Sequence, residues 1–391
     1  MRPPLLWIAS HLFSPSGIAD EARGFLRALE GAGWEPAARE LSPGKAAVPL
    51  PRPERAMLQR QLGRDPASPP LAVHHYVPRP GRYVRPSPLA NVARVLAEVD
   101  GLPRGWRELL ADRDRVWVPS RHNLELFIRG GVPAQRVRIL PGTLDFGAFR
   151  PGLEPYPLSV PPRHLVFLTN FDFSERKGWR ELLLAWARAF EPGDPVCLVL
   201  KTGSVVDFTP AEVTARIDGF LRRRFGHGAR RRLAPVRLIA RMLPAREVPR
   251  LYAAADAYVS VSRGEAWGRP YMEALAMGLP TIGSRWGGNL DFMDESTSWL
   301  VDGELVPVPP DAEVLPAADF YRGHRWFQAD VDELAAALRD VAADPSRARR
   351  RAAPARAQLE ARFGPSATCA RVEELARDAL APQGRLAEVA G

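Results

Sequence analysis

Cysteine and long apolar runs are scarce in this chain of 391 residues. Its two cysteines, Cys197 and Cys369, lie far apart, and Cys197 stands in the apolar run VCLVL, where a buried thiol is commoner than a disulfide. No unbroken apolar run approaches the 18 or more residues that a membrane span requires. The first ten residues, MRPPLLWIAS, hold an apolar patch far shorter than the hydrophobic region of a signal peptide. We therefore expect a soluble, cytoplasmic protein without disulfides.

The balance of charge is basic, with a net charge of +9 and an isoelectric point near 10.1. Such a chain can have an anionic partner: nucleic acid, a phosphate-rich substrate or an acidic membrane surface. The densest basic cluster, residues 222–232, has the simpler interpretation of a solvated helix end. The chain shows no stacking platform and no recognised module for nucleic acid, so we expect no such partner. A peripheral contact with the inner face of a membrane stays open.

Length and pattern predict an α/β protein of two domains. A chain of 391 residues exceeds the size at which single cores stop growing. Short β-branched and aromatic runs alternate with longer helical patterns, as in parallel sheets that are covered by helices on both faces. Strands are expected at residues 5–9, 71–77, 115–120, 136–141, 164–170, 196–201, 236–240, 257–262, 279–283 and 298–301.

We therefore predict two Rossmann-like, doubly wound domains that face each other across a cleft. The proline-rich stretch 151–163 lacks periodicity, which is typical of a linker. The first domain would span residues 1–155 and the second residues 156–365, with a C-terminal helix in 366–391 packing back on the first. Ligands of such folds bind beyond the carboxyl ends of the strands.

Residues 260–293 carry the most informative pattern. A strand leads into a loop, and Pro270 is well placed as the first helical residue because its missing N–H would be unpaired there anyway. The free N–H groups and the macrodipole at this helix start favour an anion such as a diphosphate. Two carboxylates flank the turn, Glu265 in the loop and Glu273 in the helix. Taken alone, a glutamate at a helix start can also be a simple partner of the dipole.

The spacing from Glu265 to Glu273, followed by AxAxGxP and a Gly-Gly turn, resembles the E-x7-E signature of retaining glycosyltransferases of the GT-B fold, particularly family 4. Further stretches are similar to segments of this family, namely residues 14–34, 116–151, 174–190 and 251–262. The resemblance spans most of residues 1–380, with weak cover over about 40–70 and 302–325. It implies transfer of a hexosyl group from an NDP-sugar to an acceptor hydroxyl of a polysaccharide, glycolipid or secondary metabolite.

The resemblance also implies roles for single residues. Glu273 would accept hydrogen bonds from the nucleotide ribose, Glu265 would contact the donor sugar, and Lys177 would neutralise the diphosphate leaving group. A surface role for Lys177 is less attractive because the chain has only two other lysines. Backbone N–H groups of Gly287, Gly288 and Asn289 would reach the phosphate or sugar, since glycine permits close approach. The other expected donor contacts are Arg176, Lys201, Met242, Gly268, Arg269 and Pro270. Gly17 would approach the phosphates or the acceptor from the opposite domain.

Acceptor and catalytic contacts are expected from the first domain. His74 and His75 end a strand, and one of them would reach the donor sugar or the acceptor, with a structural histidine as the alternative. Glu98 and Asp100, in the stretch AEVDGLP, resemble an E-x-D-x-P segment of relatives and are candidate acceptor contacts.

The chain departs from the family at one position. Many relatives carry an arginine six residues before the lysine, whereas this chain has Phe171. Diphosphate binding would then depend on Lys177 and on Arg176 or Lys201. Arg176 has the alternative of an exposed charge at a helix start.

The expected reaction needs no metal ion, no other cofactor and no covalent enzyme intermediate. Residues 112–114 spell D-x-D, but they directly precede a strand, and we interpret them as a solvated turn. One alternative is a nucleotide-sugar-binding protein of the same fold without turnover. Another is an NAD-dependent oxidoreductase, which needs a G-x-G-x-x-G turn after a strand. Neither residues 14–20 nor residues 226–231 supply that turn.

Overall fold

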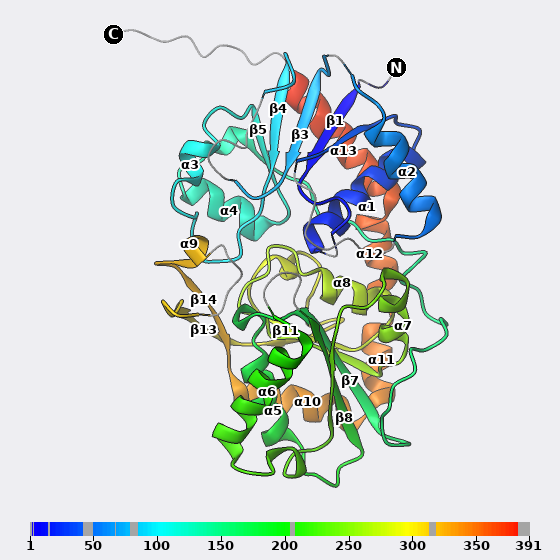
Figure 1. Cartoon of the computed structure of the whole chain (residues 1–391), viewed down its shortest axis with the longest axis vertical. Helices are drawn as coiled ribbons and strands as arrows, with labels where there is room; N and C mark the ends of the chain where they lie inside the picture. The colour runs from blue at the N-terminus through cyan, green and yellow to red at the C-terminus, as the bar shows by residue number, and fades with distance from the viewer. Residues whose placement is uncertain are drawn as a thin grey trace.

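The structure is a computed structural model, which describes residues 2, 4–14, 16–41, 50–66, 68–78, 85–203, 208–312 and 318–381. Each half of the chain forms a six-stranded parallel sheet, and a two-stranded antiparallel sheet is attached to the second half. Figure 1 shows the two halves stacked along the long axis of the molecule. The predicted fold class, two doubly wound α/β units, is confirmed.

The first sheet has the order β2-β1-β3-β4-β5-β6. Its strands are β1 (Leu5–Ala9), β2 (Ala37–Glu40), β3 (Leu71–His75), β4 (Ala90–Arg94), β5 (Arg115–Val118) and β6 (Val137–Ile139). The helices of this half are α1 (Gly17–Gly31), α2 (Arg52–Leu62), α3 (Trp106–Leu109), α4 (Arg121–Arg129) and the 3-10 turn η1 (Ala134–Arg136). The sequence does not predict β2 and β4, because AARE and ANVAR hold few strand-forming residues and pairing with neighbouring strands decides their conformation.

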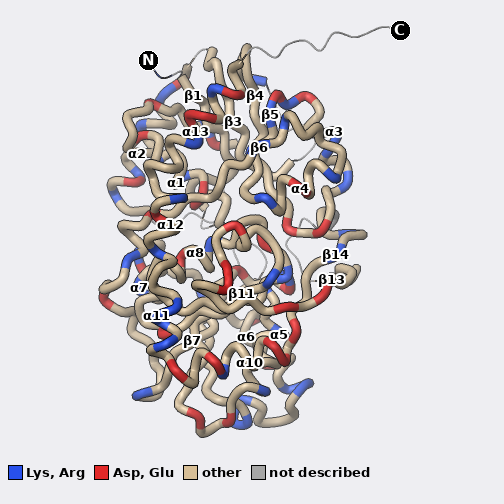
Figure 2. The backbone as a smooth tube through the Cα atoms, turned by 180° about the vertical axis from the view of Figure 1, so that it is seen from behind, with Lys and Arg blue, Asp and Glu red and all other residues tan. Residues whose placement is uncertain are grey.

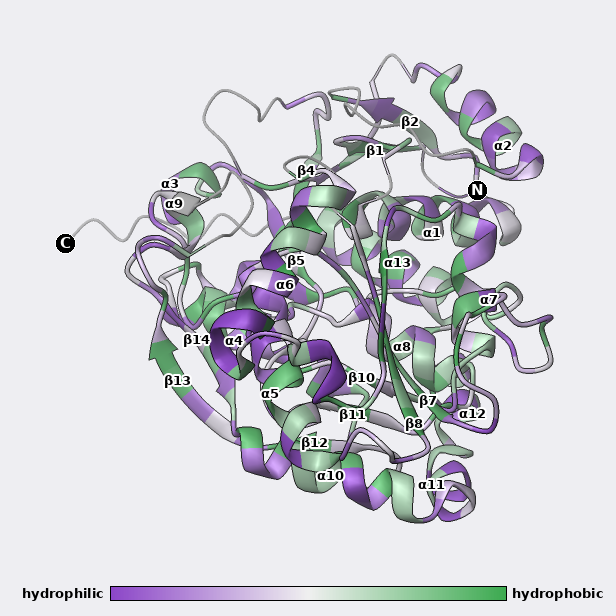
Figure 3. Cartoon of the chain, turned by 60° about the horizontal axis from the view of Figure 1, so that its bottom comes forward, coloured by the Kyte–Doolittle hydropathy of each residue, from purple (hydrophilic) through white to green (hydrophobic). Residues whose placement is uncertain are grey.

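The second sheet has the order β12-β11-β10-β7-β8-β9. Its strands are β7 (Leu165–Asp172), β8 (Val196–Gly203), β9 (Val236–Ala240), β10 (Ala257–Val259), β11 (Thr281–Ser284) and β12 (Trp299–Val301). Its helices are α5 (Trp179–Ala189), α6 (Pro210–Phe225), α7 (Val248–Ala253), α8 (Arg269–Ala276) and α10 (Val331–Ala343), with 3-10 turns η2 (Glu175–Lys177), η3 (Ala229–Arg231), η4 (Ala245–Glu247) and η5 (Gly288–Asp291). Figure 3 shows hydrophobic β7 and β8 inside, with hydrophilic faces on α6 and α10 outside.

The chain returns to the first half at its C-terminal end. After α11 (Pro345–Ala352) and α12 (Ala355–Phe363), helix α13 (Pro365–Leu380) lies beside α1 in Figure 1. Val372 and Leu375 of α13 join the core that contains Phe25 of α1. Residues 382–391 of the expected terminal helix lie outside the described residues.

An antiparallel hairpin, which we call the arm, reaches from the second half to the first. It consists of β13 (Gly303–Pro307), α9 (Ala318–Tyr321) and β14 (Arg325–Ala329). Phe320 packs edge-on against Trp106 of α3 at a ring distance of 5.4 Å. The arm coincides with the weak part of the family resemblance, and the sequence does not predict its strands.

Each parallel sheet reverses its strand order at one point. In the first sheet this switch lies between β1 and β3, and in the second between β7 and β10. Ligands of open α/β sheets bind beyond the carboxyl ends of the strands at such a switch. The loops after β7 and β10 are therefore the place to look for a site in the second half.

Candidate functional site

The loop after β10 and the start of α8 carry the two glutamates of the E-x7-E pattern. Gly268 precedes the helix with φ of +91°, a left-handed conformation that favours glycine, and no side chain caps the helix. Pro270 stands in the first turn, as expected for a residue without an N–H. Glu265 and Glu273 are both buried. Their pattern is therefore carried by one strand-to-helix junction at the switch point.

Glu265 is held by two cations from the end of β7. Its Oε1 atom lies 2.5 Å from Nζ of Lys177 and 3.6 Å from Nη1 of Arg176. Burial raises the pKa of Glu265, but the charges of Lys177 and Arg176 outweigh it, so the pKa lies below its ordinary value. Glu265 is therefore ionised at neutral pH and is already part of a charged cluster.

The turn η2 brings Lys177 to this cluster. The hydroxyl of Ser174 accepts a hydrogen bond from N–H of Arg176 and caps the turn. Gly178 follows with φ of +64°, and a Cβ there would clash with the carbonyl oxygen of Val261 after β10. Glycine is required at this position because the two strand-end loops touch there.

Glu273 has a different environment from Glu265. Its Oε2 atom accepts a hydrogen bond from the Tyr252 hydroxyl at 2.9 Å, and Arg269 lies 3.4 Å from Oε1. Burial raises the pKa of Glu273 above its ordinary value, although Arg269, Tyr252 and Lys201 act against the shift. Burial also lowers the pKa of Lys201, and the charges of Asp172 and Glu273 act against this shift.

Arg269 connects the site to the first half. Its Nη1 atom donates a hydrogen bond to the carbonyl oxygen of Thr143 at 3.2 Å. A Cβ built at Gly17, the first residue of α1, would lie 3.9 Å from Cδ of Arg269. The structure thus brings the predicted residues Gly17, Arg269 and Glu273 together across the two halves.

The Gly-Gly turn supports the Glu265 loop. The N–H of Gly288 donates to the carbonyl oxygen of Glu265 at 2.8 Å, and a Cβ at Gly288 would clash with Ala266. Asn289 is fully buried, and its amide donates to the carbonyl oxygen of Ser284 at 2.9 Å. The backbone N–H of Gly288 is therefore used inside the loop, and the Asn289 side chain helps to shape the loop. The expectation that backbone N–H groups of this turn reach a ligand stays a prediction for Gly287 and Asn289. Gly287 has φ of +109° and forms the bend itself.

His74 and His75 point to opposite faces of the first sheet, because side chains alternate along a strand. The His75 ring lies against Trp7 and Phe25, and its Nε2 is 3.0 Å from Oε2 of Glu21. Both histidine rings are buried. The contacts of His75 therefore belong to the interior of the first half.

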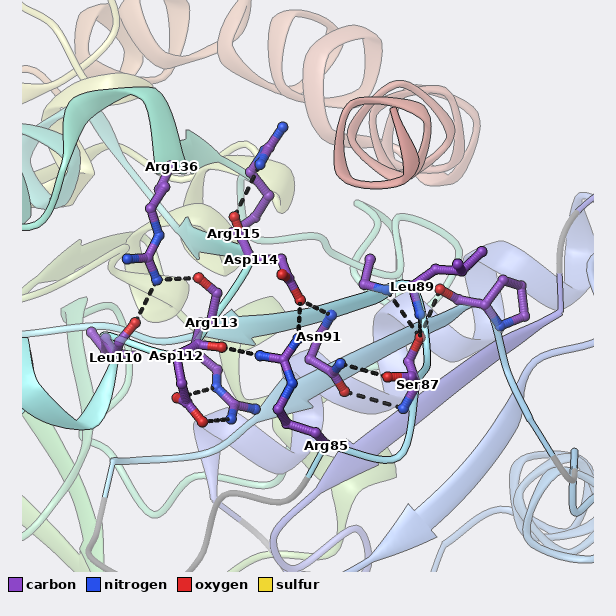
Figure 4. A network of polar contacts seen from close by, with 12 residues as sticks. Arg85, Ser87, Leu89, Asn91, Leu110, Asp112, Arg113, Asp114, Arg115 and Arg136 are labelled. Carbon is purple, nitrogen blue, oxygen red and sulfur yellow. Dashed lines mark hydrogen bonds and ion pairs between the residues drawn. The ribbon is translucent and has the colours of Figure 1, made fainter. Parts of the chain in front are cut away.

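His74 belongs to a second interior region. Its Nδ1 atom lies 3.2 Å from the Tyr76 hydroxyl, and burial together with Arg113 lowers the pKa of His74 to about 3. Figure 4 shows the polar network around Arg113, in which Asp114 accepts from the backbone N–H of Asn91 at 2.7 Å. The D-x-D residues 112–114 thus hold the start of β5 through Asp112, Arg113 and Asp114, and Arg113 is buried rather than solvated.

Glu98 and Asp100 occupy the seam between the halves. Glu98 lies 3.1 Å from Arg176 and accepts a hydrogen bond from the Tyr321 hydroxyl of the arm at 3.1 Å. Asp100 accepts from both the backbone N–H and Nε of Arg325, each at 2.8 Å. The two carboxylates predicted as acceptor contacts are therefore engaged with the second half.

Two further positions from the sequence analysis are Phe171, which replaces the family arginine, and Met242, an expected donor contact. Phe171 is buried in the core of the second half, so this position supplies no charge. Met242 is 39% exposed, and a Cβ at Gly203 would lie 2.9 Å from its sulfur, which places Met242 over the end of β8.

Tyr252 is a functional candidate that sequence reasoning missed. Its stretch LYAAADAYVSVS indicated only a helix and a strand near the site.

The helices, the potential metal ligands and the surface charges of the described residues bear on which partners the chain can have. Within the described ranges, no helix has the length and apolarity to cross a membrane, and no group of three or more potential metal-binding side chains occurs. Figure 2 shows basic and acidic residues interspersed along both halves. The arginines 222–224 at the end of α6 are exposed, and Arg230 pairs with Asp218 at 2.7 Å.

Known proteins match this chain in sequence and in fold. Residues 162–315 match the family described as Glycosyl transferases group 1. A stretch of 86 residues is 35% identical to GDP-mannose-dependent alpha-mannosyltransferase of Corynebacterium glutamicum, and it covers 22% of this chain and 20% of that protein. The match thus spans about a fifth of the length of this curated relative.

Solved structures match over nearly the whole chain. HepE of Anabaena, in complex with UDP and glucose, has a TM-score of 0.67 at 14% identity, covering 95% of this chain and 99% of that one. Sucrose-phosphate synthase of Thermosynechococcus elongatus has a TM-score of 0.66 at 20% identity, covering 96% and 98%. The chain therefore has the GT-B fold, and its residues 162–315 are similar to the family of glycosyl transferases group 1.

Proposed function

We propose that this chain is a retaining glycosyltransferase that moves a hexosyl group from an NDP-sugar to an acceptor hydroxyl. The observation that carries the proposal is the junction of β10 and α8, where Glu265 with Lys177 and Glu273 with Arg269 lie at the switch point of the second sheet. This junction falls inside the stretch that matches glycosyl transferases group 1.

The donor would lie along the loops after β7 and β10. Glu273 would accept hydrogen bonds from the ribose, and the diphosphate would face Lys177 and the uncapped start of α8. HepE, which has the same fold, was solved with UDP and glucose, and the curated relative is named for GDP-mannose. Both names support an NDP-sugar as the donor class.

The chemical step would break the bond between the anomeric carbon and the diphosphate oxygen. The acceptor oxygen would bond to the same face of that carbon, and its proton would pass to the leaving diphosphate. Lys177 would stabilise the charge that grows on the diphosphate, and Glu265 would orient both Lys177 and the sugar. No covalent enzyme intermediate is part of this scheme.

The acceptor would enter from the first half, next to the start of α1. Gly17 lies there with no side chain, and it faces Arg269 of the donor side. His11, in the loop after β1, adopts φ of +63°, which is uncommon for a residue other than glycine. Residues held in such conformations cluster at ligand sites, so the β1–α1 loop is the acceptor edge in this proposal.

The test is donor binding and NDP release by the purified full chain. A thermal-shift screen with UDP-, GDP- and dTDP-sugars would identify the donor, because a ligand that binds only the folded state raises its stability. With that donor, Lys177→Ala should lower NDP release by about 100-fold or more, since the ammonium that stabilises the negative charge of the leaving diphosphate is lost. Glu273→Ala should weaken donor binding about 10-fold or more.

Glu304→Ala is a matched control for Glu273→Ala, because Glu304 is an exposed carboxylate on β13. It should bind donor and release NDP like the parent chain. If Glu273→Ala behaved like this control, the assignment of the site would be wrong.

A further inference from the structure

Tyr252 stands behind Glu273, out of contact with solvent. It lies on α7 with no exposed surface, and its ring packs on Phe149 and Tyr258 at centroid distances of 6.0 and 5.6 Å. Its hydroxyl is 2.9 Å from Oε2 of Glu273, and a longer contact of 3.4 Å reaches the carbonyl oxygen of Pro270. Tyr252 thus joins α7 to the first turn of α8, where the donor would lie.

The direction of this hydrogen bond is set by Asn170 at the end of β7. The side-chain amide of Asn170 donates to the Tyr252 hydroxyl at 3.4 Å. Because that amide nitrogen has no lone pair to offer, the phenol proton is left for the two oxygens near the hydroxyl, and Oε2 of Glu273 at 2.9 Å is nearer than the Pro270 carbonyl oxygen at 3.4 Å. The three side chains form a chain of donors that ends on Oε2.

Charged and titratable groups face Glu273 from every element around it. Arg269 lies on its own helix, Lys201 comes from β8, and Tyr252 and Tyr258 come from α7 and β10. Burial raises the pKa of Glu273, and the Tyr252 hydroxyl counteracts this because it hydrogen-bonds the ionised carboxylate. Without the hydroxyl, Glu273 would be protonated at a higher pH.

We propose that Tyr252 is a positioning residue of the donor site, which binds Oε2 of Glu273 and leaves Oε1 turned toward the ribose hydroxyls of the donor. This inference rests on the proposed function. A ribose needs a carboxylate in one orientation and in the ionised form to accept its hydrogen bonds. Tyr252 holds the Glu273 carboxylate in this orientation and favours its ionised form from the buried side. Arg269 approaches Oε1 from α8, the helix that also carries Glu273.

The experiment compares the parent chain with Tyr252→Phe and Tyr258→Phe. Tyr258 is an exact match in chemistry and burial, but its hydroxyl donates to the backbone carbonyl of Asn170 at 3.4 Å instead of to Glu273. Binding of UDP and of GDP is measured by calorimetry from pH 5 to pH 8, together with NDP release at saturating donor. Unfolding by urea checks that each variant is folded.

Tyr252→Phe should bind the nucleotide about 10-fold more weakly than the parent at pH 5, because without the phenol hydroxyl Glu273 is protonated at a higher pH and a protonated carboxyl accepts ribose hydrogen bonds less well. The difference should shrink toward pH 8, and turnover at saturating donor should stay within about 2-fold there. Tyr258→Phe should follow the parent profile. This dependence on pH separates positioning of an ionised carboxylate from a structural role.

Two outcomes would overturn the inference alone: Tyr252→Phe and Tyr258→Phe with the same profile, or a loss for Tyr252→Phe that is equal at every pH. If the parent chain bound neither UDP nor GDP, the proposed function would fail and the inference would fall with it.

Discussion

Each half of the molecule buries a carboxylate among basic side chains, Glu21 in the first half and Glu265 in the second. Glu21 lies on α1, 2.8 Å from Arg94 and 3.0 Å from Nε2 of His75. Burial raises the pKa of Glu21, but Arg94 and His75 outweigh it and bring the pKa to about 2. The direct partners of this cluster all come from the first half.

The cluster around Glu265 is shared between the halves. Lys177 and Arg176 follow β7, but Arg176 also lies 3.1 Å from Glu98 of the first half. Burial and ion pairing are common to both clusters, so they do not mark a functional site by themselves. The Glu265 cluster differs from the Glu21 cluster because it lies at the switch point of a parallel sheet and because a bound anion could also pair with its cations.

Removing the charge of Glu21 should have the largest effect on stability. Glu21→Gln leaves Arg94 buried without its counter-charge, which costs about 3–5 kcal/mol in the free energy of unfolding. Urea unfolding at pH 7 measures it, with Glu265→Gln as the comparison. Equal losses in the two variants would contradict the distinction between a structural and a functional cluster.

The same cluster predicts how stability depends on pH. The pKa of Glu21 is about 2 in the folded chain against an ordinary 4.5, so its contribution is complete above about pH 4.5 and is lost as the pH falls toward 2. The parent should lose about 3 kcal/mol from this group over that window. Glu21→Gln should lack this part of the slope, and parallel curves for the two proteins would show that Glu21 is not responsible.

Glu265→Gln should instead act mainly on turnover. Arg176 keeps its contacts with Glu98 and the carbonyl oxygen of Gly264, so the fold loses less than in Glu21→Gln. NDP release should fall about 100-fold, because Lys177 and the sugar lose the group that orients them. Unchanged release would remove Glu265 from the site.

The smallest effect on stability is expected for an exposed ion pair between the two halves of the chain. Arg325→Ala breaks an ion pair with Asp100 in which Arg325 is 57% exposed, and such pairs contribute about 1 kcal/mol or less. Arg188→Ala, which breaks the exposed pair with Asp332 inside the second half, is the matched control. Thermal unfolding should separate the two variants only slightly; a loss of several kcal/mol for Arg325→Ala would show that the arm holds the halves together.

Local patterns predicted much of the fold. Strands such as β1, β7, β8 and β9 are apolar, β-branched runs, and their ends agree with the expected ranges within a few residues. The strands β2, β4, β13 and β14 were not predicted, because their residues adopt extended structure only when a neighbouring strand pairs with them.

By itself the sequence determined the doubly wound α/β class and the strand-to-helix junction that carries Glu265 and Glu273, because both follow from local periodicity and spacing. The GT-B fold followed from the resemblance of the E-x7-E pattern to a known family. Only the tertiary structure decided which buried faces His74 and His75 occupy, and that Glu98 binds Arg176 instead of lying free. It also placed Tyr252 behind Glu273. Alternation along a strand predicts that the side chains of neighbouring residues point to opposite faces of the sheet, but it does not predict which residues they contact there. Contacts between distant segments form only when the two halves of the chain have packed together.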